Sequence, residues 1–148
     1  MTGSASALFT IGYEGRTQAE LIDQLRLAGV TLLIDVRALP LSRKAGFSKR
    51  VLAASVEATG LAYAHLRPLG TPKPGRDAAR RGDAHALERI YAEHLQGDPA
   101  QHALAEATAL AREHRACLLC YERDPACCHR RFVAELIAET IALPVTDL

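Results

Sequence analysis

The chain has 148 residues, of which 49% are hydrophobic and 24% are charged, and its formal net charge at pH 7 is +1. A chain of this length and composition forms one ordinary globular domain, which excludes intrinsically disordered and fibrous proteins. The longest uninterrupted apolar run covers residues 116–121, far short of the roughly 20 residues that a membrane-spanning helix needs, so we expect no membrane partner.

Four short apolar segments predict β-strands, and a fifth segment near residues 143–146 is a weaker candidate. The four lie at residues 7–13, 31–36, 61–66 and 116–121. The second and the fourth are apolar runs rather than alternating patterns, which is typical of strands that are covered on both faces. These segments therefore predict a buried sheet.

Helical patterns with clear start and stop signals separate the predicted strands. Thr17 and Glu20 have the spacing of a capping box, and Gly29 marks the end of this first helix. The other helices are expected at residues 48–60, around 87–97, at 98–113 and at 129–141. This alternation predicts a single α/β domain over residues 1–148, Rossmann-like and in three layers, with a mostly parallel sheet of four to five strands and helices on both faces.

Positive charge is concentrated in the middle of the chain. Ten basic and two acidic residues lie between Arg37 and Arg81, whereas the rest of the chain is net negative. Residues 67–83, which are rich in Pro, Gly and Arg, predict a long basic loop within the domain. A local excess of this size favours an anionic partner, either a small molecule or a nucleic acid. The alternative is a solvated basic face without a ligand.

Ligands of open parallel sheets bind beyond the carboxyl ends of the strands, and the sequence places polar residues at four of these ends. Arg37 and Arg130 are suited to hold a phosphate or a carboxylate in bidentate fashion. The alternative for Arg130 is an internal pair with Glu122 or Asp35. The candidates for substrate binding are Gly12, Tyr13, Arg37, Ser42, Arg43, Lys73 and Arg130.

The candidates for catalysis are two carboxylates and a cluster of cysteine and histidine, namely Asp35, Glu122, Cys120, Cys128 and His129. Asp35 and Glu122 would transfer protons, with internal pairing to arginine as the alternative. Cys120 or Cys128 would be a nucleophile near the start of a helix, with a packed thiol as the alternative. The position of Cys120 resembles rhodanese and low-molecular-weight phosphatase sites, although nine residues separate it from Arg130, more than in those families.

The four cysteines are expected to be reduced thiols. No apolar stretch precedes the first basic residue, Arg16, so we expect no secretory signal and a cytoplasmic protein, in which a disulfide is not favoured. The spacing C-x2-C-x6-C-C lacks the two paired hooks of a structural zinc site. We therefore predict no metal and no cofactor, while a smaller site of Cys120, Cys128 and His129 stays open as an alternative.

Several motifs together resemble one family. TIGYEGR at residues 10–16, LIDVR at 33–37, LCYE at 119–122 and CHR at 128–130 occur in an order and spacing that resemble the bacterial and archaeal family called domain of unknown function 488. The resemblance implies a compact α/β domain and supplies no settled activity.

These observations favour a small enzyme, a hydrolase or a transferase, that binds a phosphate- or nucleotide-like substrate at the carboxyl edge of the sheet. The alternative is a non-catalytic module that binds nucleic acid or an acidic protein through the basic loop. The two hypotheses differ in salt dependence, because phosphate contacts along a nucleic acid make affinity fall steeply with salt.

Overall fold

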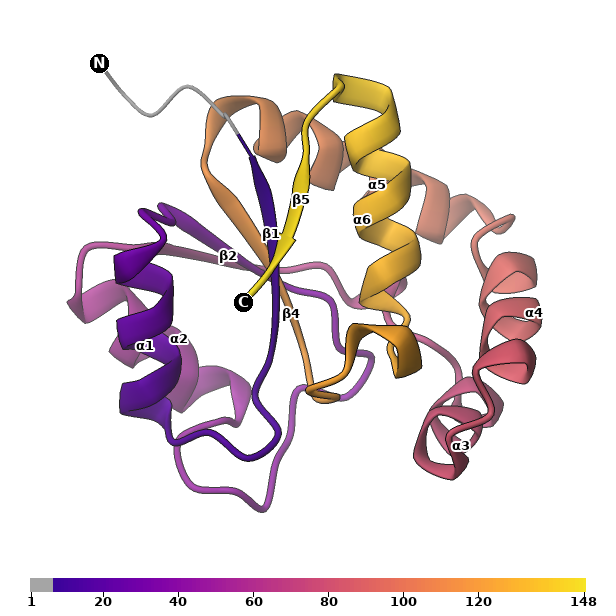
Figure 1. The fold of residues 1–148 in the computed structure, drawn as a ribbon, viewed down its shortest axis with the longest axis horizontal. Helices are drawn as coiled ribbons and strands as arrows, with labels where there is room; N and C mark the ends of the chain where they lie inside the picture. Colours follow the sequence, from indigo (N-terminus) through magenta and orange to yellow (C-terminus); the bar gives the residue numbers. More distant parts are fainter. Residues whose placement is uncertain (1–6) are drawn as a thin grey trace.

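The computed structural model describes residues 7–148 and is built on one five-stranded parallel sheet (Figure 1). The strands follow the spatial order β3-β2-β4-β1-β5. The sheet confirms the predicted α/β fold with a parallel sheet, and the weak fifth segment is a real strand. The strands are β1 (Leu8–Gly12), β2 (Leu32–Asp35), β3 (Ala62–His65), β4 (Ala116–Cys120) and β5 (Val145–Asp147).

Helices cover both faces of the sheet, as Figure 1 shows. One face packs against α1 (Gln18–Leu27) and α2 (Lys49–Ala58), and the other against α5 (Asp98–Glu113) and α6 (Arg130–Ile141). The two faces have separate apolar cores. Residues along β4 alternate between them: Cys117 packs with the first core, whereas Leu118 and Cys120 pack with the second. The apolar runs are thus strands buried on both sides, as predicted.

The capping signals place the helices well. Thr17 and Glu20 form the expected capping box, in which the Thr17 hydroxyl accepts a hydrogen bond from the Glu20 backbone and the Glu20 carboxylate accepts one from the Thr17 backbone. The helix predicted over residues 98–113 has these bounds in the structure, with Pro99 in its first turn, where a missing N–H costs nothing.

The expectation of a long loop over residues 67–83 is wrong. The segment forms a short 3₁₀ helix, η1 (Arg67–Leu69), and a regular helix, α3 (Lys73–Arg81), which leads into α4 (Ala84–His94). Its prolines and glycines are compatible with a helix because Pro74 lies in the first turn, and Gly82 ends the helix in the left-handed conformation. The remaining short helix, η2 (Pro125–Cys127), precedes α6.

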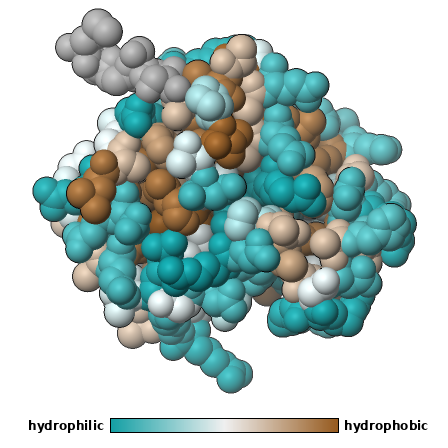
Figure 2. Space-filling model, viewed as in Figure 1, coloured by the Kyte–Doolittle hydropathy of each residue, from teal (hydrophilic) through white to brown (hydrophobic). Residues whose placement is uncertain are grey.

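The described surface carries no extended apolar face in the view of Figure 2, where hydrophobic side chains form small patches among hydrophilic ones. Within residues 7–148, no helix is both long and apolar enough to span a membrane.

The strand order creates a crevice at the carboxyl edge beside β4. β4 lies between β1 and β2, yet the helices that follow β1 and β2 cover one face, while the helix that follows β4 covers the other. The chain segments that leave neighbouring strands therefore diverge, which opens space above the strand ends.

Packing of the backbone explains why residue 12, at this edge of the sheet, is a glycine. A Cβ atom on Gly12 would lie 1.9 Å from the carbonyl oxygen of Glu122, so the loop after β4 can pass over β1 only because residue 12 has no side chain. From the sequence, Gly12 is a candidate for substrate binding, since a residue without a side chain lets another group come close to the backbone. The structure shows that the neighbouring backbone makes this approach.

We expect Gly12→Ala to lower the free energy of unfolding by about 3 kcal/mol, because either β1 or the Glu122 backbone must shift. Urea unfolding followed by circular dichroism measures the change. Gly97→Ala is the control: its φ is −72° and its Cβ would make only ordinary contacts, so a change below about 1 kcal/mol is expected. Equal effects of the two substitutions would contradict the explanation.

Candidate functional site

A pocket of about 380 Å³ opens at the carboxyl edge of the sheet. Tyr13 follows β1, Arg37 follows β2, and Cys120 and Glu122 lie at the end of β4 and just after it, so three neighbouring strands supply its floor. His129, at the start of α6, also lines it. The structure thus brings Tyr13, Arg37, Cys120, Glu122 and His129, all candidates from the sequence, to one pocket.

Arg37 is held in place by a buried ion pair with Asp35. Its guanidinium donates through Nε to Oδ1 of Asp35 at 2.9 Å and through Nη2 to Oδ2 at 2.7 Å, and Nη1 donates to the carbonyl of Phe47. Tyr63, on β3, donates its hydroxyl hydrogen to Asp35. Burial acts to lower the pKa of Arg37, but the charge and hydrogen bonds of Asp35 outweigh it and raise the pKa.

These contacts leave Asp35 without access to a substrate. The carboxylate is completely buried, is bonded on both oxygens and does not line the pocket. The hypothesis of Asp35 as a general base is therefore replaced by its alternative, pairing with Arg37. It positions Arg37, whose edge does reach the pocket.

Two histidines fix the backbone of the same loop. His129 donates from Nε2 to the carbonyl of Val36 at 2.8 Å, and His65 donates from Nε2 to the carbonyl of Arg37 at 2.8 Å. Burial lowers the pKa of His129 to about 4, so its ring is neutral at pH 7. The segment after β2, which forms one wall of the pocket, is thus held in place by His65 of β3 and by His129 at the start of α6.

Arg130 supports the loop after β4 rather than a ligand. Its side chain is completely buried, and its guanidinium donates to the carbonyls of Glu122 and Arg123. It does not line the pocket, so the expectation that it grips a substrate anion is wrong in this structure. Arg130 also forms no ion pair with Glu122 or Asp35, because its partners are backbone oxygens. Its role is nevertheless internal to the protein.

Glu122 is the carboxylate that this support presents to the pocket. Burial, and to a smaller extent the nearby charge of Glu14, raise its pKa to about 7, although the charges of Arg130 and Arg80 act in the opposite direction. A carboxyl group with this pKa exchanges a proton near neutral pH, which is the property required of a general acid or base.

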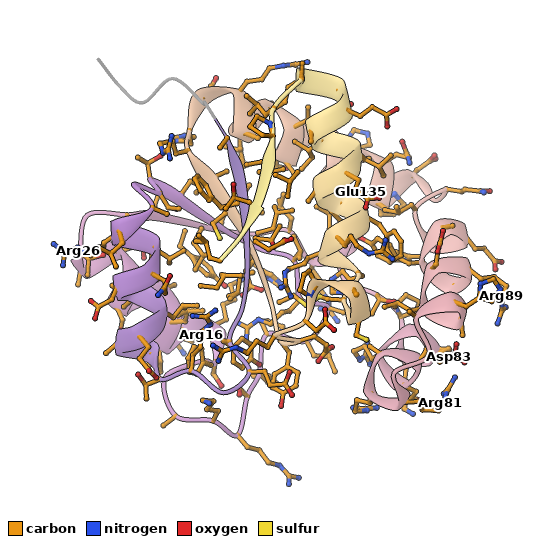
Figure 3. The ribbon with its side chains drawn as sticks, viewed as in Figure 1. Arg16, Arg26, Arg81, Asp83, Arg89 and Glu135 are labelled. Atoms are coloured by element: carbon orange, nitrogen blue, oxygen red, sulfur yellow. A yellow bond between two sulfur atoms is a disulfide. The ribbon has the colours of Figure 1, made fainter. Side chains whose placement is uncertain are left out.

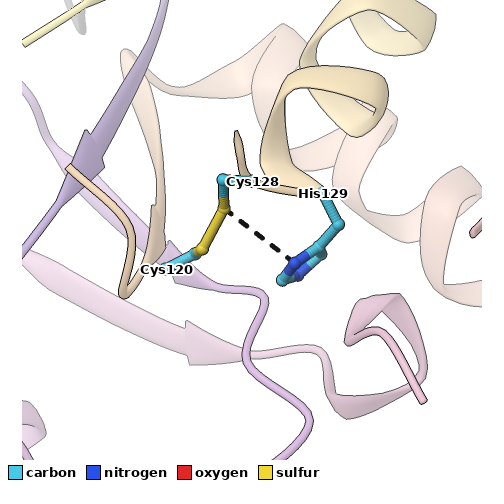
Figure 4. A group of neighbouring side chains, drawn as sticks. All are labelled: Cys120, Cys128 and His129. Carbon is cyan, nitrogen blue, oxygen red and sulfur yellow. Dashed lines mark hydrogen bonds between the residues drawn. A yellow bond between two sulfur atoms is a disulfide. The ribbon is translucent and has the colours of Figure 1, made fainter. Parts of the chain in front are cut away.

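Cys120 and Cys128 form a disulfide bond, contrary to the expectation of reduced thiols (Figure 4). The turn of η2 folds the loop back, so that Cys128, just before α6, meets the end of β4. Cys117 and Cys127 are free. Neither Cys120 nor Cys128 is a free nucleophile in this state. Nδ1 of His129 lies 3.9 Å from Sγ of Cys128, and within residues 7–148 these three side chains are the group whose potential ligand atoms all lie within 4.8 Å of one another.

Helix α3 supplies the outer wall of the pocket. Arg76 and Arg80 lie one helical turn apart and both line it, as does Thr71 just before the helix. Arg76 donates to the carbonyl of Thr71 at 2.9 Å, and Arg80 pairs with Asp77 on the surface. Sequence reasoning missed these arginines, although their spacing of four is a usable signal once the segment is recognised as helical.

The other candidates for substrate binding lie outside the pocket. Ser42 shapes the loop before α2, where its backbone exchanges hydrogen bonds with the hydroxyl of Ser48. Arg43 is exposed, and Lys73 is exposed in an ion pair with Asp77. Gly12 lies under the loop after β4. Cys128, a candidate for catalysis, also lies outside the pocket and is buried behind Cys120. None of these five residues, Asp35 or Arg130 lines the pocket.

Comparison with known proteins confirms the family. A family model described as "Domain of unknown function DUF488" matches residues 17–137, which include the strand ends and loops that form most of the pocket. The chain belongs to this family. No curated protein and no solved structure matches the chain. The description of the DUF488 family names no activity.

We expect Arg37→Ala to lower the free energy of unfolding by about 3–5 kcal/mol, because it leaves Asp35 charged and buried without its partner. Urea unfolding measures the loss, and the double variant Asp35→Ala/Arg37→Ala should lose less than the sum of the single variants. Lys73→Ala, which breaks the exposed pair with Asp77, is the control and should cost less than about 1 kcal/mol. Additive effects in the double variant would contradict a buried pair.

We also expect Glu122 to make stability depend on pH. An acid with a raised native pKa contributes stability that is complete below its ordinary value of 4.5 and is lost as the pH rises through about 7. A shift of this size corresponds to about 3 kcal/mol at a fully buried site, and solvent screening at half-buried Glu122 reduces it to about 1–2 kcal/mol.

Accordingly, Glu122→Gln should be more stable than the unmodified protein at pH 8 by about 1–2 kcal/mol and only slightly more stable at pH 5. Urea unfolding at the two pH values tests this. Glu135→Gln, at an exposed position on α6 (Figure 3), is the control and should show no such difference. An equal gain from Glu122→Gln at both pH values would refute the assignment.

Proposed function

We propose that this DUF488 domain is a small enzyme that binds an anionic, phosphate- or nucleotide-like substrate in the pocket at the carboxyl edge of the sheet. The observation that carries the proposal is that two arginines of α3, Arg76 and Arg80, line one pocket with the carboxyl group of Glu122.

The polar groups of the outer wall support an anionic ligand. Arg37 is already neutralised by Asp35, so the available positive charge comes from Arg76 and Arg80. The pair between Arg80 and Asp77 is on the surface, where such pairs contribute little and are readily exchanged for another anion. The hydroxyl of Thr71 is buried at the pocket and has no hydrogen-bond partner within residues 7–148, as a group that serves a ligand would be.

The rim of the pocket supports a substrate with an apolar or aromatic part. Leu39, Leu41 and Tyr121 line it and are all exposed. Tyr121 lies edge-on to Tyr13, with ring centroids 5.2 Å apart, and Tyr13 stacks on Phe47 at 4.5 Å. A planar base that packs on these groups while its phosphate meets the arginines fits this distribution better than inorganic phosphate alone.

Glu122 is the group placed to transfer a proton. It lies in the same pocket as the arginines, and Arg130 fixes the backbone that carries it. A carboxyl group beside a bound phosphate ester is suited to activate water or another acceptor, so hydrolysis or group transfer is the class of reaction that this arrangement favours.

The alternative of a nucleic-acid-binding module has less support. Outside the pocket, the basic side chains of α3 are Lys73 and Arg81, and each lies beside an acid, Asp77 or Asp83, so little net positive charge is left on this face of the helix. A surface that tracks a phosphate backbone needs an extended row of cations.

Binding of nucleoside monophosphates, measured by isothermal titration calorimetry, tests the proposal. Arg80→Gln should weaken binding by about tenfold or more, because a charge-assisted contact is lost. Arg81→Gln is the matched control: it removes the same charge from the next residue of α3, which lies outside the pocket beside Asp83 (Figure 3), and should change affinity by less than about twofold. Glu122→Gln should retain binding and lose turnover of a phosphate ester.

Equal weakening by the Arg80 and Arg81 variants would show that only the general positive field attracts the ligand and would refute the pocket. Tight binding of mixed-sequence nucleic acid that falls steeply with salt, without binding of mononucleotides, would support the alternative module. Turnover that is unchanged in Glu122→Gln would remove Glu122 from the reaction.

A further inference from the structure

Three buried side chains, two at the floor of the pocket and one behind it, form a cluster with the donor atoms of a metal site. The sulfur atoms of Cys120 and Cys128 and a ring nitrogen of His129 all lie within 4.8 Å of one another. Within residues 7–148, no other group of three such side chains has this arrangement. Figure 4 shows the imidazole turned toward the two sulfur atoms.

The fold holds these residues from two independent elements. Cys120 is the last residue of β4, whereas Cys128 and His129 lie between η2 and α6. The core fixes Cys120 from the strand side, and the hydrogen bond from His129 to Val36 fixes the ring from the β2 side. The cluster is therefore assembled by the sheet edge and does not depend on a flexible loop alone.

The orientation of His129 is that of a metal ligand. A carbonyl oxygen can only accept a hydrogen bond, so the contact with Val36 places the ring hydrogen on Nε2. The lone pair of the neutral ring then lies on Nδ1, which is the atom that faces Sγ of Cys128 at 3.9 Å. Histidines that bind metals almost always donate their other N–H to a carbonyl or carboxylate in this way.

The surroundings of Cys128 also suit a thiolate. The backbone N–H of Arg130 points to Sγ of Cys128 at 3.5 Å. A donor of this kind stabilises a negatively charged sulfur, which is the form that binds a metal. In a tetrahedral zinc site the donor atoms lie about 3.5 Å apart, so the present positions need only small side-chain rotations once the sulfurs are separate.

We propose that, once the disulfide is reduced, Cys120, Cys128 and His129 bind one thiophilic divalent cation, with Zn²⁺ the best match to two thiolates and an imidazole. Reduction by a dithiol transfers two electrons and two protons, breaks the S–S bond and leaves two thiols, while the reductant becomes a disulfide. Binding of the cation then displaces the two thiol protons to solvent.

The fourth coordination position would open to the pocket. Cys120 and His129 line the pocket, whereas Cys128 lies behind them. Three protein ligands with one open position are typical of catalytic rather than structural zinc sites. The oxidised chain has no free thiolate at this place, so the same two cysteines make metal binding dependent on the redox state. The site adjoins the proposed nucleotide-binding pocket but shares none of the arginines proposed to bind the phosphate, because it uses neither Arg76 nor Arg80.

Titration of the reduced protein with Zn²⁺ under anaerobic conditions, with a chromophoric chelator as competitor, tests this inference. We expect one ion per chain, and Co²⁺ in its place should give the absorption of a tetrahedral thiolate complex. The disulfide form of the same protein should bind at least about 100-fold more weakly, a comparison that requires no substitution.

Variants locate the site. Cys128→Ser and His129→Gln should each weaken Zn²⁺ binding by at least about tenfold, with circular dichroism to show that the variants are folded. Cys127→Ser is the matched control, because Cys127 is a free cysteine next to Cys128 and is not part of the cluster. It should bind Zn²⁺ as the unmodified protein does.

Failure of the reduced, unmodified protein to bind Zn²⁺ would overturn the proposal. So would equal binding by the reduced and disulfide forms, or a loss of binding in Cys127→Ser as large as that in Cys128→Ser, because either result places the ion elsewhere. Nucleotide binding is measured separately with Arg80→Gln and Arg81→Gln, so failure of one proposal leaves the other unaffected.

Discussion

The pocket depends on the neutralisation of one buried arginine within its own loop. Removing a guanidinium and a carboxylate from water costs several kcal/mol for each ion, and this cost is offset only where geometry and further hydrogen bonds are good. Asp35 and Arg37 meet this condition, since two parallel hydrogen bonds join them and Tyr63 and Phe47 provide additional partners. The direction of the chain after β2, and with it the wall of the pocket, follows from this pair.

Burial divides the arginines of the site into two groups with different roles. Arg37 and Arg130 are almost or completely buried, and acceptors of the protein itself bind the terminal nitrogens of their guanidinium groups. Arg76 and Arg80 lie on a helix at the surface and line the open space. Sequence motifs point to the first group because Arg37 follows the end of β2 and Arg130 begins the helix after β4. The second group is the one that can exchange its partners for a substrate.

The fold and part of the site could be predicted from the sequence because local signals agree with the tertiary structure. Apolar runs mark the buried strands, the capping box marks α1, and the rule for parallel sheets brings Tyr13, Arg37 and Glu122 to one edge. The helix α3 was missed because its prolines and glycines suggest a loop unless their positions in the first turn and after the last turn are considered.

Other features depend on contacts that spacing does not contain. The role of Asp35 is decided by its complete burial, and the disulfide by the path of the loop through η2. Likewise, Arg130 donates to backbone carbonyls of the loop after β4, which passes directly over Gly12. These contacts form only when the strands lie side by side in the sheet. The sequence can therefore identify these residues as candidates, but it does not show which groups they contact.

The placement of α3 has a consequence for how this domain can diversify. The helix packs on α4 through Ala78, Ala79 and Leu87, which form a small apolar cluster that meets one core of the sheet only at its edge, through Phe132. The pocket wall that carries Arg76 and Arg80 thus belongs to α3, at the periphery of the domain, whereas the floor belongs to the central sheet. Mutations on the side of α3 that faces the pocket can therefore change this wall while the ion pair under the floor stays as it is.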